Sequence, residues 1–394
     1  MIKKLIKATV VGAAVFGMVA AANAEVNINI YGASAQYKFW NDAADDFLSD
    51  EGCSSIQQAA GNSTYSTKNH GITKGTCNGE TWYIRYSSKA SYDGIRAMQN
   101  IDPDSVSSCT NKGQREMADE TSSTVPANGG TNWSTGVVYS LACKDINIGA
   151  SDVEAAALAG MESHGDLLGP LGGGWEDRVM DASTIYDTGL SYYRPIVVPF
   201  AFFKNNSVPY TNLTKMMAAH LFSGQIYDWA DFDPTQTSQD AVMCLRHAGS
   251  GTHATLNAVV MNNAAPILTD ATFAGMLYPM FYFNDGSSDM VNCLANVEGS
   301  IGYADADQTV ASNVTRISYQ GVEATKANIV NGEYPFWAAQ WLYVDSIVAN
   351  SPIDKLATWA ADPDNMPTTR ATYWAAQDEM NVVKTNSFTF PVRQ

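Results

Sequence analysis

The segment Arg246–Thr252, which reads Arg-His-Ala-Gly-Ser-Gly-Thr, places an arginine, two glycines and two hydroxyl residues within seven positions. A guanidinium can grip two oxygens of a tetrahedral anion at once. Glycines let the backbone approach a ligand closely, and a helix that begins here offers free N–H groups and a positive dipole end. The segment therefore predicts an oxyanion site with donors from Arg246, Ser250 and Thr252. A turn followed by an ordinary helix cap is the alternative that it leaves open.

The segment Gly149–Asp152, which reads Gly-Ala-Ser-Asp, adds a carboxylate after another expected strand. Phosphate near neutral pH keeps a proton that it can donate to Asp152. Sulfate has no such proton, so the carboxylate facing it would be unpaired and repelled. One aspartate can thus select phosphate over sulfate by leaving the wrong ion unsatisfied. The alternative is that Asp152 caps the Ala-rich helix that follows.

The elements that must position these two segments alternate along the chain. Alternating or compact apolar runs predict strands over residues 26–31, 81–87, 145–148, 195–203 and 241–245. Helices are expected after the turn at 32–34, over 91–100, after 152, over 212–222 and over 253–262. Two polar stretches, at about 50–80 and 102–134, are interpreted as surface loops. Strands that alternate with helices indicate an α/β fold.

The first residues have the composition of a cleavable leader. Three lysines precede an apolar run at about 8–21, and Ala-Asn-Ala at 22–24 fits the small-x-small cleavage pattern. Residues 1–24 are therefore expected to be a signal peptide, and the mature chain is expected to begin at Glu25. The apolar run is too short for a comfortable membrane span, which needs about 20 residues. We expect a soluble, exported chain in the periplasm, with an extracellular location as the alternative.

The charge of the chain excludes several classes of partner. The formal net charge is −17, and loss of a leader with three lysines and no acidic residue lowers it to −20. A strongly acidic surface repels nucleic acid and anionic lipid, so we expect neither as a partner. The same surface repels phosphate at long range. An anion site must therefore act through local geometry.

Six cysteines lie beyond the expected leader, at positions 53, 77, 109, 143, 244 and 293. An even count in an exported chain favours disulfides, and six cysteines allow 15 pairings. We expect sequential pairing, because each neighbouring pair brackets a plausible local loop. Buried free thiols are the alternative. The sequence contains no C-x-x-C or C-x-x-C-H motif, which argues against redox catalysis and covalent haem, and we expect no cofactor.

Two patterns that would indicate an enzyme are incomplete. Ser250 lies between His247 and His253, but the nucleophile elbow Gly-x-Ser-x-Gly is broken by Ala248. The five histidines show no H-E-x-x-H and no paired Cys/His spacing. We therefore expect no catalytic residue and no metal site. The chain has 9 Trp and 19 Tyr, which pack cores or, as an alternative, line a pocket for a small organic ligand.

Taken in order along the chain, six motifs resemble those of the periplasmic phosphate-binding proteins of ABC transporters, the PstS-type solute-binding family. The resemblance extends, with gaps, from about Asn27 to about Tyr343. The motifs are Tyr-Gly-Ala-Ser-Ala-Gln-Tyr at 31–37, Gly-Ala-Ser-Asp at 149–152, the strand at 194–203, the Leu…Leu-Phe-Ser-Gly-Gln-Ile…Trp signature at 213–229, the loop at 246–252, and Gly-Ser-Ile-Gly-Tyr at 299–303.

The resemblance implies a two-lobed periplasmic-binding-protein fold with hinge strands and a central ligand cleft. Lobe one would combine residues 25–193 with 310–394, and lobe two would span 194–309. It also implies an ABC transporter permease in the inner membrane as the partner, with phosphate or a similar oxyanion as the ligand. We expect the binding protein to be a monomer. A surface interaction protein that reuses the fold is the alternative, because fold does not fix function.

The resemblance also implies a set of site residues. The anion ligands would be Arg246, Ser250, Gly251 and Thr252, with Asp152 as the proton acceptor. Gln36 and Tyr37 occupy the place of a ligand pair in the first turn. Ser91 is the expected counterpart of a further serine ligand, with Ser88 as its alternative.

The chain departs from the family pattern at two places. The family usually has Thr-Phe where this chain has Gln36 and Tyr37. It often has an aspartate within the arginine loop where this chain has Ala248. Because both places lie at the expected site, another oxyanion such as sulfate or molybdate stays an alternative to phosphate.

Overall fold

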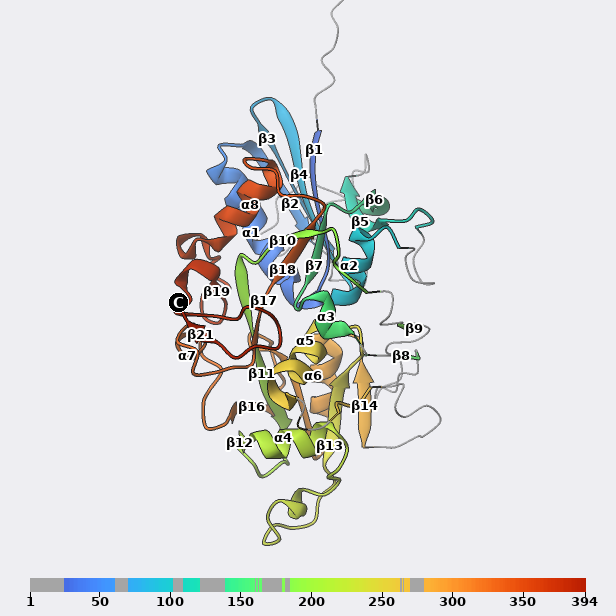
Figure 1. The fold of residues 1–394 in the computed structure, drawn as a ribbon, viewed down its shortest axis with the longest axis vertical. Helices are drawn as coiled ribbons and strands as arrows, with labels where there is room; N and C mark the ends of the chain where they lie inside the picture. Colours follow the sequence, from blue (N-terminus) through green and yellow to red (C-terminus); the bar gives the residue numbers. More distant parts are fainter. Residues whose placement is uncertain are drawn as a thin grey trace, which may run out of the picture.

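The computed structural model describes residues 25–394 except 61–69, 102–108, 121–138, 160, 162, 165–178, 181–184, 263, 265 and 270–279. The expected signal peptide, residues 1–24, lies outside the described residues. Two sheets with their helices form two α/β lobes, one above the other in Figure 1. The predicted α/β class is confirmed.

The first lobe is built on a seven-stranded sheet. Its strands, in spatial order, are β10 (Ser191–Tyr193), β18 (Trp341–Val344), β7 (Ile148–Ser151), β1 (Glu25–Gly32), β4 (Glu80–Ser88), β3 (His70–Cys77) and β2 (Ser54–Ala60). The three central strands β7, β1 and β4 are parallel, and the outer strands pair antiparallel. The carboxyl ends of the three parallel strands therefore share one edge of the sheet.

The second lobe is built on an eight-stranded sheet. Its strands, in spatial order, are β12 (Asn212–Leu213), β16 (Val314–Tyr319), β11 (Ile196–Asn205), β15 (Ser300–Asp305), β13 (Val242–Arg246) and β14 (Phe281–Asn284), with β17 (Trp337–Ala339) and β19 (Ala375–Ala376) also paired to β11. Strands β15, β13 and β14 are parallel neighbours, so their carboxyl ends also share one edge. All ten residues of β11 are buried, which agrees with the apolar and aromatic sequence of its first eight residues.

Along its described strands, the chain passes between the two sheets three times, the third time between β18 and β19. The chain passes from β10 of the first sheet into β11 of the second at Arg194 and Pro195. It returns from β17 to β18 at Gln340, whose backbone N–H donates to the carbonyl of Ile196 at 2.9 Å. Strand β16 lies beyond the expected lobe boundary at residue 310, yet it pairs with β11 in the second sheet.

The helices follow the strands that position them. The first sheet carries α1 (Tyr37–Asp50), α2 (Ser91–Met98), α3 (Ala155–Leu158) and α8 (Pro352–Ala361); Figure 1 shows α1 and α8 to one side and α2 to the other. The second lobe carries α4 (Lys215–Phe222), α5 (Gly251–Thr255) with the π-helical turn η4 (Leu256–Met261), and α6 (Ser287–Asn296). The chain also forms α7 (Lys326–Val330) and the short 3₁₀ turns η1 (Ser34–Gln36), η3 (Trp229–Asp231), η6 (Pro363–Asn365) and η7 (Gln377–Glu379).

The prediction that the two polar stretches are surface loops was wrong for much of their length. Residues 54–60 and 70–77 form β2 and β3, which extend the first sheet. Strand β3 pairs with β4 from His70↔Ser87 to Cys77↔Glu80, so the neighbouring strand supplies the backbone partners that local composition did not reveal. In the second stretch, β5 (Gln114–Glu120) pairs with β6 (Tyr139–Asp145). The strand expected over 145–148 begins at Ile148, after β6 has ended.

Sequential disulfide pairing is confirmed. The bridges join Cys53 to Cys77, Cys109 to Cys143 and Cys244 to Cys293. The first two tie down the strands found within the polar stretches, and the third fastens β13 to α6. The two-stranded ribbons β8 (Ser163–His164) with β9 (Val179–Met180), and β20 (Val382–Val383) with β21 (Val392–Arg393), complete the described elements. Within the described ranges, we find no helix with the length and apolar character needed to cross a bilayer.

Candidate functional site

The first lobe presents polar groups just beyond the carboxyl ends of its parallel strands. Strand β1 ends at Gly32 and leads to Ser34, β4 leads to Ser91 at the start of α2, and β7 leads to Asp152. Gly32 has a φ of 138°, and a Cβ there would lie 2.1 Å from the carbonyl oxygen of Ala150. Only glycine therefore allows β1 to turn so close to β7.

The second lobe presents its own polar groups in the same way. Strand β13 ends at Arg246 and leads through the glycine loop to α5. Its neighbours β14 and β15 end at Asn284 and Asp305. Ligands of open α/β sheets bind beyond the carboxyl ends of the strands. Here two such edges face each other.

The two edges are in direct contact. The backbone N–H of Tyr92 in α2 donates to the carbonyl of Gly249 at 3.3 Å. An added Cβ on Gly251 would lie 2.2 Å from Ser91 Oγ and 2.6 Å from Asp152 Cβ. The start of α5 therefore fits against the first lobe only because position 251 has no side chain. The structure thus brings the two segments singled out in the sequence to one place.

Arg246 is a buried cation held by neutral groups. Its side chain is 1% exposed, and its guanidinium donates to the carbonyls of Asn284 (3.3 Å) and Asp285 (2.7 Å). It also donates at 3.4 Å to Ser287 Oγ, and at 3.4 Å to Ser34 Oγ of the opposite lobe. Among the described residues, no carboxylate forms an ion pair with it. Burying a charge without a counter-charge is costly, so this guanidinium is suited to an anionic ligand.

Asp152 lies across from Arg246, and the pKa of its carboxyl group is raised. Burial, reinforced by the charge of Asp305, raises the pKa of Asp152 to about 7, and Arg246 opposes this shift. Ser91 Oγ accepts the backbone N–H of Asp152 at 3.0 Å. The Oδ1 atom of Asp152 is buried and has no hydrogen-bond partner among the described residues. The carboxyl group can therefore change its charge near neutral pH and accept a proton from a ligand.

The lobe-two residues predicted for the site lie together. Ser250 is the N-cap of α5, with its Oγ accepting the backbone N–H of His253 at 3.4 Å, so the capping interpretation applies to this hydroxyl. Gly251 and Thr252 form the first two positions of the helix and are buried. Their backbone N–H groups belong to the first turn of α5, where helix donors lack intrahelical partners.

The first-turn pair Gln36 and Tyr37 has mostly structural contacts. Gln36 Nε2 donates to the carbonyl of Ser151 at 3.1 Å, and its Oε1 accepts Trp40 Nε1 at 2.9 Å. Gln36 thereby fixes the turn that carries Asp152. Tyr37 begins α1 and is half-buried, and burial together with the charge of Asp42 raises its pKa.

The two candidate serines differ in their surroundings. Ser91 contacts Asp152 and faces Gly251. Ser88 is the last residue of β4 and is also buried. The contacts of Ser91 favour it over Ser88 as the serine of the site.

Two polar residues of this region were missed in the sequence. Ser34 reaches Arg246 from the opposite lobe, and Asp305 ends β15 beside the arginine strand. Ser34 lies within the recognised motif at 31–37, so its spacing to the glycine could have indicated it. Asp305 follows the motif at 299–303 by two residues, and only the alignment of strand ends shows where it points.

The hydrolase and metal alternatives gain no support from the geometry. The ring Nδ1 of His253 pairs with the Tyr303 hydroxyl, and burial with the nearby Arg246 charge lowers the pKa of His253 to about 3. The hydroxyl of Ser250 caps the helix. Within the described ranges, no group of three or more His, Cys, Asp or Glu side chains could hold a metal ion.

Comparisons with known proteins agree with these motifs. Residues 179–363 match the model of the PBP superfamily domain. The phosphate-binding protein PstS of Bacillus subtilis (strain 168) is 26% identical over 170 residues, which cover 43% of this chain and 50% of the relative. The chain thus matches about half the length of that curated relative.

Solved structures were matched over more of the chain. A putative phosphate ABC transporter substrate-binding protein with bound phosphate from Clostridium perfringens has 16% identity and a TM-score of 0.48, covering 86% of this chain and 94% of the other. A high-affinity periplasmic phosphate-binding protein, PfluDING, has 15% identity and a TM-score of 0.49, covering 93% and 96%. The sequence matches agree with the resemblance that the motifs predicted: residues 179–363 match the model of the PBP superfamily domain, and the chain is similar to a PstS phosphate-binding protein.

Proposed function

We propose that the protein captures an oxyanion, most simply phosphate, between its two lobes and delivers it to an ABC transporter. The observation that carries this proposal is Arg246, a guanidinium that is 1% exposed and has no ion-pair partner among the described residues. An anion placed between the sheet edges would supply the missing counter-charge.

The ligand would be held by donors from the second lobe. Arg246 would form charge-assisted hydrogen bonds with two of its oxygens. The N–H groups of Gly251 and Thr252 in the first turn of α5 add donors and the positive end of a helix dipole, since α5 continues into η4. These donors suit any tetrahedral oxyanion.

Selection of phosphate would fall to the first lobe. Asp152 is buried, and its unpaired Oδ1 can accept a proton that phosphate carries and sulfate lacks. Sulfate would leave this oxygen unsatisfied next to an anion, which opposes its binding. The same chemistry disfavours molybdate, which also lacks a proton near neutral pH.

Two connecting segments are suited to act as a hinge. We place the outward crossing at Arg194 and Pro195 and the return crossing at Gln340, because β16 and β17 both pair with β11 in the second sheet. In this division, lobe two extends to about residue 339, beyond the boundary at 310 that the sequence suggested, and β19 returns to its sheet. A ligand that contacts both edges would stabilise the closed form.

The relatives suggest where the captured ion would go. The matched relative is a phosphate-binding protein, and the matched structures include an ABC transporter substrate-binding protein. We propose the same role here: an exported, periplasmic monomer whose closed form docks on a membrane permease. Catalysis is not part of this proposal, because Ser250 serves as a helix cap and His253 is neutral and paired to Tyr303.

Calorimetric titration of the protein, freed of bound ligand, tests the proposal. Phosphate should bind with one-to-one stoichiometry, and sulfate under the same conditions should give little heat. Absence of heat with phosphate, sulfate and molybdate alike would refute oxyanion capture. In that case the organic-ligand and surface-interaction alternatives would take its place.

A further inference from the structure

Two carboxyl oxygens near Arg246 are buried without a hydrogen-bond partner among the described residues. One is Oδ1 of Asp152, and the other is Oδ1 of Asp305. The two residues are 2% and 3% exposed. Buried polar atoms are nearly always satisfied, so each such oxygen needs a physical reason. The proposed function uses only the first of the two.

Asp305 is held at the same sheet edge as Arg246. Strands β15 and β13 run parallel, with Ser300 opposite Val242 and Ile301 opposite Met243, so Asp305 and Arg246 both lie at the carboxyl ends. The backbone N–H of Ala306 donates to the carbonyl of Pro199 at 2.9 Å, which fixes the end of β15.

The side chain of Asp305 is oriented by one specific contact. Gln308 Nε2 donates to Oδ2 of Asp305 at 2.6 Å. That contact leaves the Oδ1 atom as the acceptor without a donor. The arrangement parallels Asp152, whose backbone is fixed by Ser91 while its Oδ1 stays unpaired.

The charges around Asp305 come from several elements. Burial and the neighbouring Asp307 raise its pKa, while Gln308, Lys38 of α1 and Arg246 of β13 act to lower it. The charge of Asp305 in turn raises the pKa of Asp152 of the opposite lobe.

Tyr86 of β4 is a further titratable group near both carboxyl groups. Burial raises its pKa first, and the charges of Asp152 and Asp305 raise it further. Tyr86 therefore stays neutral and adds no charge. One buried guanidinium thus faces two carboxyl groups. Each of their unpaired oxygens can accept one proton from a ligand, and a phosphate dianion carries only one.

We propose that Asp305 is a second proton acceptor of the anion site, so that the site holds phosphate together with two protons. This inference rests on the proposed phosphate binding. The monobasic ion has two P–OH groups, one for each unpaired carboxylate oxygen. The dibasic ion has one, and would leave the other carboxylate facing an anion. When the dibasic ion is the species in solution, binding takes one proton from the solvent.

The first test measures protons directly. Calorimetric titrations with inorganic phosphate at about pH 8.5, in buffers with different ionisation enthalpies, give the number of protons taken up per ion bound. We expect about one proton for the unaltered protein. The dissociation constant should then rise about tenfold per pH unit above the second pKa of phosphate. Uptake near zero, with a dissociation constant that does not change with pH, would overturn the inference while leaving phosphate capture intact.

A matched pair of variants assigns the second proton. Asp305→Asn should reduce the uptake to nearly zero and flatten the pH dependence, because the amide no longer needs a proton from the ligand. Asp231→Asn, which changes an exposed aspartate of the same lobe, should behave like the unaltered protein. Unchanged uptake in Asp305→Asn would overturn the assignment. If that variant does not fold, the pH slope of the unaltered protein decides alone. Absence of phosphate binding at every pH would instead overturn the proposed function, and this inference with it.

Discussion

The two sides of the site differ in how their polar groups are already used. On the second lobe, the Arg246 guanidinium is held by two carbonyls and a hydroxyl of its own lobe, and Ser250 caps α5. On the first lobe, the atom to which we assign a role is an unpaired acceptor, Oδ1 of Asp152. One side is a fixed set of donors, and the other is an acceptor whose charge varies near neutral pH.

Because of this difference, the second lobe should control the affinity for oxyanions in general, and the first lobe should control the selectivity among them. Donors that are held in place before a ligand arrives lose little entropy on binding, so they contribute mainly to affinity. An unpaired acceptor penalises ligands that cannot donate, so it contributes mainly to the choice of ion. Changes on the second lobe should therefore weaken all oxyanions alike, and changes at Asp152 should alter their ranking.

The largest effect is expected from Arg246→Ala. Removing one partner of a buried charge pair costs about 2–5 kcal/mol, so the affinity for phosphate should fall by about 30-fold to about 4,000-fold. Calorimetry measures the loss, and thermal melting of the ligand-free variant reports whether the fold is intact. Binding at the original strength would show that the donor set lies elsewhere.

A smaller effect is expected from Gly251→Ala, which alters the contact between the two sides. The added methyl group would lie 2.2 Å from Ser91 Oγ and 2.6 Å from Asp152 Cβ, so the edges could not close fully. Overpacking of this kind costs about 1–3 kcal/mol. In the open form that the proposed hinge allows, this clash would be relieved, so it should appear as lost affinity for every ion, while the melting temperature without ligand changes little.

Gly286→Ala is the matched control for that substitution. The nearest atom to its added Cβ is Asp289 Oδ2 at 3.3 Å, in the same lobe. This variant should bind phosphate nearly as well as the unaltered protein. Equal losses in both variants would mean that any added methyl near the site disturbs it, and the steric argument about closure would be lost.

Asp152→Asn should change selectivity more than affinity. An amide can donate to sulfate, so the ratio of phosphate to sulfate affinity should fall by about tenfold or more, which corresponds to about 1.4 kcal/mol. Titrations with both ions measure the ratio. An unchanged ratio together with lower stability would support the interpretation of Asp152 as a structural residue.

Asp152 should also make the stability of the ligand-free protein depend on pH. Its folded pKa of about 7 lies above the value of 3.8 for an unperturbed aspartate. The folded state therefore binds more protons between these values. The stabilising contribution of the neutral carboxyl is complete below about pH 4 and is lost as the pH rises to 7. Thermal melting across this range should show a fall in stability that is shallower in Asp152→Asn.

The sequence predicted one segment of the site on each lobe, Gly149–Asp152 and Arg246–Thr252. It missed two further polar residues, Ser34 and Asp305. Motif spacing placed Arg246 and Asp152 after strands, and strand ends converge by geometry, so these two could be predicted. Ser34 lies within the motif at 31–37, but its contact with Arg246 crosses between the lobes, and Asp305 reaches the site only through the alignment of strand ends, which no local pattern shows. The same reason explains β2 and β3: their pairing with β4 is non-local, and their Ser- and Thr-rich composition suggested a loop.

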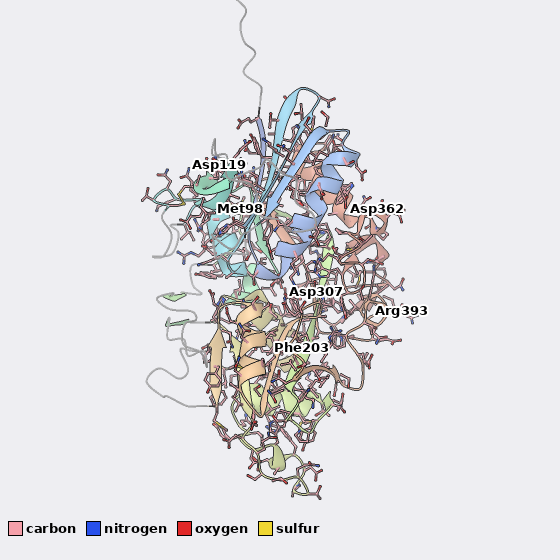
Figure 2. The ribbon with its side chains drawn as sticks, turned by 180° about the vertical axis from the view of Figure 1, so that it is seen from behind. Met98, Asp119, Phe203, Asp307, Asp362 and Arg393 are labelled. Atoms are coloured by element: carbon pink, nitrogen blue, oxygen red, sulfur yellow. A yellow bond between two sulfur atoms is a disulfide. The ribbon has the colours of Figure 1, made fainter. Side chains whose placement is uncertain are left out.

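The smallest effect is expected where the lobes meet away from the ion. Arg370 pairs with Asp42 of α1 on the first lobe and with Asp307 beyond β15 of the second. Figure 2 labels Asp307 at the level where the lobes meet. Because this arginine is partly solvated, Arg370→Gln should weaken phosphate binding by only about 1 kcal/mol through a less stable closed form. It should leave the phosphate-to-sulfate ratio unchanged. A changed ratio would show that this ion pair shapes the site itself, and the division between fixed donors and a selective acceptor would then be too simple.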